Sequence, residues 1–185
     1  MMIDITLGIT PEMADTAAEN TARSLIGHIG THFDVMDREF PLEYTRRDGI
    51  VFDVSQIRER DILPEDIDLS RVREGMFVAF HTGYVREVEY GTRKYFKEHP
   101  QLSGALIEAL LSRHISIIGI DCAGIRRGKE HTPTDQHCAD HGVFVVENLA
   151  ALDSLLAVSP EFTARTYPVR FFGMTGLPCR VVAEV

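Results

Sequence analysis

The chain has 185 residues, of which 44% are hydrophobic and 25% charged, and its formal net charge at pH 7 is −9. That length suits one globular domain, spanning residues 1–185, with a sizeable core. The acidic balance argues against a nucleic-acid partner, because phosphate binding needs a basic face that this chain does not supply.

Two further features of the composition bear on where the protein works. The first twenty residues contain acids and no long apolar run, so we expect neither a signal peptide nor a membrane span there. The three cysteines are widely spaced and odd in number, which disfavours a disulfide framework. We therefore expect a protein of the reducing cytoplasm that has no membrane partner.

Apolar runs in the first half of the chain predict strands. An alternating strand is expected at 2–9 and an extended segment at 24–35, followed by buried strands at 49–55 and 75–84 that begin at glycine. The stretch 63–72 between the buried strands has a proline and acids suited to the start of a short helix.

The second half mixes helices with strands. Residues 102–115 have apolar side chains at helical spacing, with Ser103 as the N-cap. Further strands are expected at 116–124, at 142–152 and in a hairpin-like or paired-strand segment at 169–185 that turns at Gly176 and Pro178. This mixture predicts an α/β domain, in an order less regular than that of a doubly wound parallel sheet.

The segment His-Ile-Gly-Thr-His-Phe-Asp at 28–34 concentrates ligand-type side chains. His28, His32 and Asp34 offer imidazole nitrogen and carboxylate oxygen, which suit zinc and, less selectively, manganese or iron. The alternative is a polar loop in which the histidines only form hydrogen bonds. A metal here would need at least one more ligand, from elsewhere in the chain or from water.

More ligand-type residues follow the Thr-Pro pair at 132–133, which predicts the start of a helix over 133–141 that Gly142 ends. Such a helix would put His137 and His141 on one face, because residues four apart are neighbours. His141 could equally be an ordinary surface residue.

Glu147 ends the apolar run Val-Phe-Val-Val, which would carry its carboxylate inward. A buried carboxylate is costly unless it is paired or bound to a metal. The alternative is that Glu147 is an acid at the N-terminus of a following helix.

Together these motifs resemble the metal-dependent cyclase-like hydrolase family, which includes bacterial kynurenine formamidases. The family's hallmark, His-x-Gly-Thr-His-x-Asp-x-Pro-x-His, matches this chain from His28 to Asp34. Five more segments resemble the family's in the same order: DITLGI (4–9), GMFVAFHTGY (75–84), IIGIDCAGI (117–125), GVFVVENL (142–149) and GLPCRVVA (176–183).

The resemblance implies a swivelling β/β/α fold, one or two divalent ions, usually zinc and sometimes manganese, and hydrolysis of a C–N bond in a small N-formyl or cyclic amide substrate. By position it implies His28, His32 and Asp34 as ligands, with Asp34 able to bridge two ions. His137 and Glu147 would complete the second site. The resemblance also implies a homo-oligomer with active sites close to subunit contacts.

The chain departs from the hallmark in its last part. The proline is Met36 here, and the final histidine, which the family uses in proton transfer, is Arg38. We expect His141 to replace that histidine, ahead of three weaker candidates, Asp37, Glu39 and His131. Arg38 could bind a substrate carboxylate through its planar guanidinium, or form a salt bridge within its loop.

Three functions follow from these features. The first is a metal-dependent amidohydrolase of the formamidase type. The second is a metal-holding module that binds a small acid without efficient turnover. The third is another metal-assisted reaction, such as dehydration or isomerisation, because a fold does not fix its chemistry.

Overall fold

The computed structural model describes residues 1–11, 13, 15 and 27–185. Its strands are β1 (Met2–Asp4), β2 (His32–Asp34), β3 (Arg46–Asp53), β4 (Phe77–His81), β5 (Ile117–Ile120), β6 (Phe144–Glu147), β7 (Glu161–Thr166), β8 (Gly176–Pro178) and β9 (Val181–Glu184). Its helices are α3 (Tyr84–Glu87), α4 (Arg93–Lys97), α5 (Gly104–Leu111), α6 (His131–Asp140) and α7 (Leu152–Leu156), and short 3₁₀ turns are η1 (Leu42–Thr45), η2 (Pro64–Asp66), η3 (Leu69–Arg71) and η4 (Gly128–Glu130).

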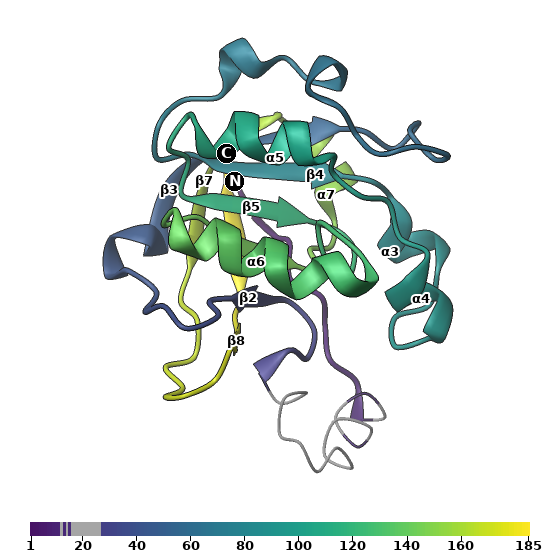
Figure 1. Cartoon of the computed structure of the whole chain (residues 1–185), viewed down its shortest axis with the longest axis vertical. Helices are drawn as coiled ribbons and strands as arrows, with labels where there is room; N and C mark the ends of the chain where they lie inside the picture. The colour runs from purple at the N-terminus through teal and green to yellow at the C-terminus, as the bar shows by residue number, and fades with distance from the viewer. Residues whose placement is uncertain (12, 14, 16–26) are drawn as a thin grey trace.

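All nine strands of the described ranges belong to one sheet, in the order β1-β9-β7-β3-β4-β5-β6-β2-β8. The central strands β3, β4, β5 and β6 are parallel, and the strands on both flanks are antiparallel. The sheet curls into a half-barrel, and α5 and α6 lie over one face of its parallel part (Figure 1). The predicted α/β class is confirmed, and the antiparallel flanks account for its irregular order.

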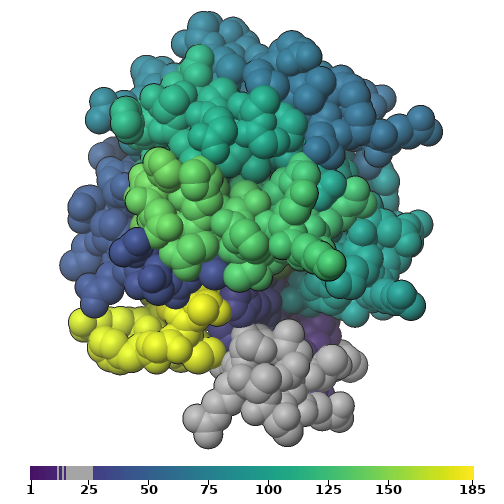
Figure 2. All heavy atoms as spheres, in the orientation of Figure 1, coloured from purple at the N-terminus to yellow at the C-terminus, as the bar shows by residue number. Residues whose placement is uncertain are grey.

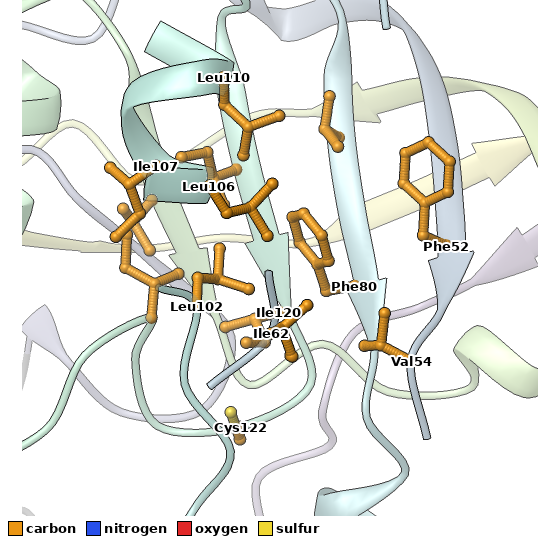
Figure 3. Close-up of a cluster of buried hydrophobic side chains, with 14 of the residues drawn as sticks. Phe52, Val54, Ile62, Phe80, Leu102, Leu106, Ile107, Leu110, Ile120 and Cys122 are labelled. Atoms are coloured by element: carbon orange, nitrogen blue, oxygen red, sulfur yellow. The ribbon is translucent and has the colours of Figure 1, made fainter. Parts of the chain in front are cut away.

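The helix-covered face of the sheet holds the first of two hydrophobic cores. Alternate residues of each strand point to this face because side chains alternate along a strand. Figure 3 shows side chains of β3, β4 and β5 meeting those of α5, among them Phe52, Phe80, Ile120, Leu106, Ile107 and Leu110. Burying each such side chain stabilises the fold by roughly 1.5–3 kcal/mol.

The other face of the sheet lines the inside of the half-barrel and holds the second core. Val51, Phe77 and Ile117 project from the parallel strands into this core. They meet Phe33 of β2, side chains of β9, and Leu152 and Leu155 of α7. Because both faces are covered, the central strands are apolar throughout rather than alternating, as in other buried parallel strands.

Most of the elements expected from the sequence are present. Ser103 caps α5, since its side chain accepts a hydrogen bond from the backbone N–H of Leu106. Gly142 ends α6 with a φ of +71°, although that helix starts at His131, two residues earlier than expected. The expected extended segment starts at residue 24, so its first three residues lie outside the described ranges.

Two expectations about local structure are met in a particular form. The stretch 63–72 holds the short 3₁₀ helices η2 and η3, and Pro64 stands in the first turn of η2. The C-terminal segment is a pair of strands but not a hairpin, because β8 pairs with β2 whereas β9 pairs with β7 and β1, at the other end of the strand order. In the part of the chain that the structure describes, no helix is both long and apolar enough to cross a membrane.

Candidate metal centre

The centre begins with the pairing of two short strands. β2 and β6 are antiparallel, with His32 opposite Glu147 and Asp34 opposite Val145. His32 and Asp34 are two residues apart and therefore point to the same face of the sheet, while Phe33 between them enters the inner core. The His32 Nε2 atom lies 3.5 Å from Glu147 Oε2 and 3.7 Å from Asp34 Oδ2.

The loop before β2 brings in a third ligand-type side chain. His28 lies 3.0 Å from Asp34, measured from Nδ1 to Oδ1, and its Nε2 atom is 2.9 Å from the hydroxyl of Thr175. Gly30 turns this loop with a φ of +62°, a conformation that favours glycine. The glycine of the sequence motif therefore has a structural role between the two histidines.

Helix α6 supplies the remaining members. His131 Nε2 lies 3.4 Å from Asp135 Oδ2 and 3.6 Å from Glu147 Oε1. His131 and Asp135 are four residues apart and so lie on the same side of the helix. Cys138 and Ala139, which are buried, mark that side as the one that faces the sheet.

These six residues form two overlapping groups of potential metal ligands, His28–His32–Asp34 and Asp34–His131–Asp135–Glu147. Within each group, one ligand atom per residue lies within 4.8 Å of all the others. Bonds of about 2.1 Å to a tetrahedral ion place neighbouring ligand atoms roughly 3.4 Å apart. The closest distances in the cluster, from 3.0 to 3.7 Å, fit that spacing.

Several buried polar atoms of the cluster have no hydrogen-bond partner among the described residues. They are His32 Nε2, Asp34 Oδ2, Asp135 Oδ1 and Glu147 Oε1. A buried polar group without a partner costs free energy, so this convergence needs an explanation. Each of these residues belongs to at least one of the two ligand groups, where a divalent cation would satisfy such atoms, and the residues therefore fit a metal.

Backbone carbonyls fix the orientation of two of the imidazoles. His32 Nδ1 lies 2.9 Å from Gly30 O, and His131 Nδ1 lies 3.1 Å from Arg126 O. Because a carbonyl can only accept, each Nδ1 carries the proton, and the Nε2 of a neutral ring presents its lone pair to the centre. Metal-binding histidines in proteins are commonly oriented in this way.

The electrostatics of the cluster also favour a cation. Burial raises the pKa of Glu147 well above its ordinary value, and Asp34 and Asp135 raise it further. Burial and Asp34 likewise raise the pKa of Asp135. Burial opposes ionisation of Asp34 as well, but the imidazoles of His32 and His28 hold its pKa below the ordinary value. Burial lowers the pKa of His32, which keeps that ring neutral and able to bind a metal.

A second layer of hydrogen bonds supports the loop that carries the histidines. Asn148 donates from Nδ2 to Gly30 O at 2.9 Å, and its backbone carbonyl accepts from the Thr31 hydroxyl at 2.7 Å. Tyr95 donates to Asn148 Oδ1 at 2.7 Å, and the Tyr90 hydroxyl accepts from the Gly30 N–H at 2.8 Å. Asn148 therefore links the end of β6 to the loop before β2.

The structure does not bring His137 to the cluster, which corrects the ligand set expected from the sequence. Its ring pairs with Glu108 of α5 at 2.8 Å and is exposed. His137 and His141 do share one face, with ring centroids 4.5 Å apart, but that face is directed to solvent. In the space-filling view α6 forms part of the outer surface (Figure 2). We therefore place His131 and Asp135 in the candidate set instead of His137.

The two residues expected to act in catalysis, His141 and Arg38, also lie away from the cluster. His141 follows the last residue of α6, ten residues after His131, which corresponds to about 15 Å along a helix. Arg38 forms a salt bridge with Asp140 at the same end of α6 and lies 3.4 Å from Asp37. The structure thus favours the surface alternative for His141 and the salt-bridge alternative for Arg38.

The sequence carried a signal for His131 and Asp135. Asp135 lies three and four residues before the apolar pair Cys138–Ala139, and His131 lies four residues before Asp135, so both share the helix face of that pair. The i,i+4 spacing of His137 and His141 is equally regular, and spacing alone does not say which face is buried. The burial of Glu147, in contrast, was expected from the apolar run before it and is observed.

Comparison with known proteins identifies relatives of this fold. The family model described as "Putative cyclase" matches residues 3–126. One similar solved structure is a "potential metal-dependent hydrolase with cyclase activity", with 23% identity over 99% of this chain and 96% of that one and a TM-score of 0.75. Another is a predicted metal-dependent hydrolase from Bacillus stearothermophilus, with 22% identity, coverage of 99% and 97%, and a TM-score of 0.72.

A third similar structure is isatin hydrolase A from Labrenzia aggregata. It shares 19% identity over 99% of this chain and 93% of that one, with a TM-score of 0.74. The search of curated proteins found no match. At these identities the solved structures establish the shared fold, and the expected cyclase-like architecture is confirmed.

Proposed function

The chain belongs to the Cyclase family, and from that premise we propose that it is a metal-dependent hydrolase that cleaves a C–N bond of a small amide or formamide. The convergence of six ligand-type side chains, four of them with unpartnered buried atoms, is the observation that carries this proposal. Similarity in fold to an isatin hydrolase and to metal-dependent hydrolases supports the same reaction class.

A divalent ion at such a centre lowers the pKa of bound water and polarises a substrate carbonyl. The residues of this chain provide the frame for that chemistry. Asp34 lies between the two ligand groups, with Oδ1 facing His28 and Oδ2 facing His32, so one carboxylate can serve both. His32 is held by Gly30 O and His131 by Arg126 O, so both rings keep their lone pairs directed inward.

Access to the centre is uneven. The side chains of His28 and His131 are 26% and 32% exposed, whereas His32, Asp34 and Glu147 are buried. We infer that a substrate approaches on the side of His28 and His131. The buried carboxylates then form the wall opposite the substrate and exclude water from that side.

One observation favours a second candidate, a metal-holding module that turns over slowly. Neither Arg38 nor His141 reaches the cluster, so neither stands where a proton would be given to the departing nitrogen. General acid–base help is worth roughly a hundred- to ten-thousand-fold in rate. Without it, the water-activating part of the reaction is retained and the overall rate is low.

The test is a hydrolysis assay on protein loaded separately with zinc and with manganese. The panel contains N-formylkynurenine, simple formamides and small cyclic amides. We expect metal-dependent cleavage of at least one of these classes. Activity should be lost in His32→Ala and should stay at the wild-type level in His137→Ala. A fully metal-loaded protein that cleaves none of them would replace the hydrolase proposal with the binding module.

A further inference from the structure

We propose that Thr175 is a positioning residue whose hydroxyl lets the imidazole of His28 move its proton from Nδ1 to Nε2 on metal binding. This inference rests on the metal centre of the proposed function, and it adds how one of the candidate ligands is made ready for an ion. Thr175 lies 147 positions after His28, directly before β8, and it belongs to neither group of potential ligands.

His28 faces the centre differently from the other two histidines. His32 and His131 direct Nε2 inward, because each Nδ1 atom meets a backbone carbonyl. In His28 it is Nδ1 that faces the cluster, 3.0 Å from Asp34 Oδ1, while Nε2 lies 2.9 Å from Thr175 Oγ1. A metal held beside Asp34 would therefore be bound by the Nδ1 atom of His28.

The tautomer of His28 must differ between the metal-free and the metal-bound protein. An ionised carboxylate can only accept hydrogen bonds, so in the neutral metal-free ring Nδ1 carries the proton and donates it to Asp34. Coordination through Nδ1 uses the lone pair of that atom, so the proton must then be on Nε2. The ring holds one proton in both forms, and only the position of that proton changes.

A hydroxyl is the hydrogen-bond partner that suits both forms of the ring. The Thr175 hydroxyl donates to Nε2 while that atom is unprotonated, and it accepts from the Nε2 proton after the exchange. A backbone carbonyl in the same place could serve only the second form, because it cannot donate. Thr175 therefore gives Nε2 a hydrogen bond in each state, whereas the carbonyls at His32 and His131 each hold a single tautomer.

The backbone around Thr175 fixes the hydroxyl at this place. The carbonyl of Thr175 accepts hydrogen bonds from the N–H groups of Val35 at 2.8 Å and Met36 at 3.1 Å, which ties it to the end of β2. A Cβ atom on the next residue, Gly176, would lie 2.7 Å from Cε1 of His28, so the glycine leaves the space that the ring occupies. Because His28 lies in a loop and is 26% exposed, these contacts rather than burial set the orientation of its ring.

The first experiment reads the tautomer of His28 by long-range proton–nitrogen correlation NMR on protein labelled with nitrogen-15. Spectra are recorded at about pH 8, above the ordinary histidine pKa of about 6.5, and His28→Gln identifies the signals of this ring. We expect the proton on Nδ1 in chelator-stripped protein and on Nε2 after zinc is added. The same tautomer in both states, or a metal-free ring with both nitrogens protonated, overturns the inference.

The second experiment measures zinc affinity by competition with a chromophoric chelator. Thr175→Val keeps the shape of the side chain and removes the hydroxyl. The affinity should then fall by about tenfold, the lower end of the range for groups beyond the ligands, because water reaches this exposed position. Thr175→Ser keeps the hydroxyl and should bind zinc as the wild type does. Unchanged affinity in Thr175→Val, or an equal loss in Thr175→Ser, overturns the inference.

Thr163→Val is the matched control, since it makes the same exchange of hydroxyl for methyl on β7, which the four parallel strands separate from β2, and it should bind zinc normally. Circular dichroism and thermal unfolding of each metal-free variant establish that it is folded before its affinity is scored. Neither experiment uses a substrate. A protein that shows the proton exchange but cleaves no amide contradicts the proposed function alone, whereas amide cleavage by a protein whose His28 keeps one tautomer contradicts this inference alone.

Discussion

His32 and Glu147 are direct cross-strand partners in the β2–β6 pair, and the imidazole Nε2 of one lies 3.5 Å from a carboxylate oxygen of the other. The two residues are 115 positions apart in the sequence (147 − 32). Their register places an imidazole lone pair and a buried carboxylate on the face covered by α6. Strand pairing therefore fixes the candidate centre more rigidly than a loop alone would.

His32→Ala should remove most of the bound metal, because His32 contacts members of both ligand groups. Metal analysis of the purified protein measures this directly, with His137→Ala as the control. Retention of the wild-type metal content in His32→Ala would contradict the assignment of the centre.

Glu147→Gln should stabilise the metal-free protein at neutral pH while it removes most of the stabilisation that metal provides. The pKa of Glu147 is raised in the folded state, so its contribution to stability is present below the unfolded pKa and is lost as the pH rises through the folded value. Glutamine has no charge to bury at any pH. Thermal unfolding with chelator and with metal measures both effects, at about 2–4 °C for each kcal/mol in a chain of this size.

Relative to the wild type, the unfolding midpoint of Glu147→Gln should therefore rise in the presence of chelator and fall in the presence of metal. A metal-free Glu147→Gln protein that unfolds at a lower temperature than the metal-free wild type at neutral pH would show that this carboxylate is stabilised in some other way. Measurement near pH 4 is the internal control, because there the difference between the two proteins should be smallest.

Asn148→Asp should weaken metal binding by about 10–100-fold without touching a candidate ligand, a range typical of changes to outer-shell groups. The amide Nδ2 donates to Gly30 O, the same carbonyl that orients His32, and a carboxylate cannot donate there. Asparagine and aspartate both tolerate the left-handed backbone at this position, where φ is +57°. Calorimetric titration with zinc measures the change, and an unaltered affinity would show that Gly30 O does not need this support.

His81 and Asp121 should make the stability of the fold depend on pH away from the centre. Their side chains lie 3.0 Å apart, and the hydrogen bond from His81 to Asp121 raises the pKa of His81. A raised histidine pKa contributes stability that is fully present below the unfolded value of about 6.5 and is lost as the pH rises through the folded value. His81→Gln should therefore reduce the free energy of unfolding near pH 6 and have little effect near pH 9.

Denaturant titration at the two pH values tests this, since glutamine keeps a donor toward Asp121 but carries no charge. Equal losses of unfolding free energy at both pH values would mean that packing of the His81 ring, rather than its charge, stabilises the C-terminal ends of β4 and β5.

Local sequence determined several strands, one helix cap and part of the candidate centre. The runs at 49–55, 75–84 and 116–124 form buried strands because they carry apolar side chains on both faces, and both faces must then be shielded from water. Ser103 caps its helix through a hydrogen bond that spans three residues. The motif at 28–34 brings His28, His32 and Asp34 together because a glycine turn and the two-residue period of a strand act within seven positions.

Tertiary structure decided what spacing leaves open. On α6, the pairs His131–Asp135 and His137–His141 have the same i,i+4 separation, and only the packing of Cys138 and Ala139 against the sheet selects the first pair. The segments β8 and β9 are close in sequence and yet join different neighbours, because the curl of the sheet brings distant edges to each. Local rules fix how a segment folds, whereas the face it buries depends on surfaces contributed by residues far along the chain.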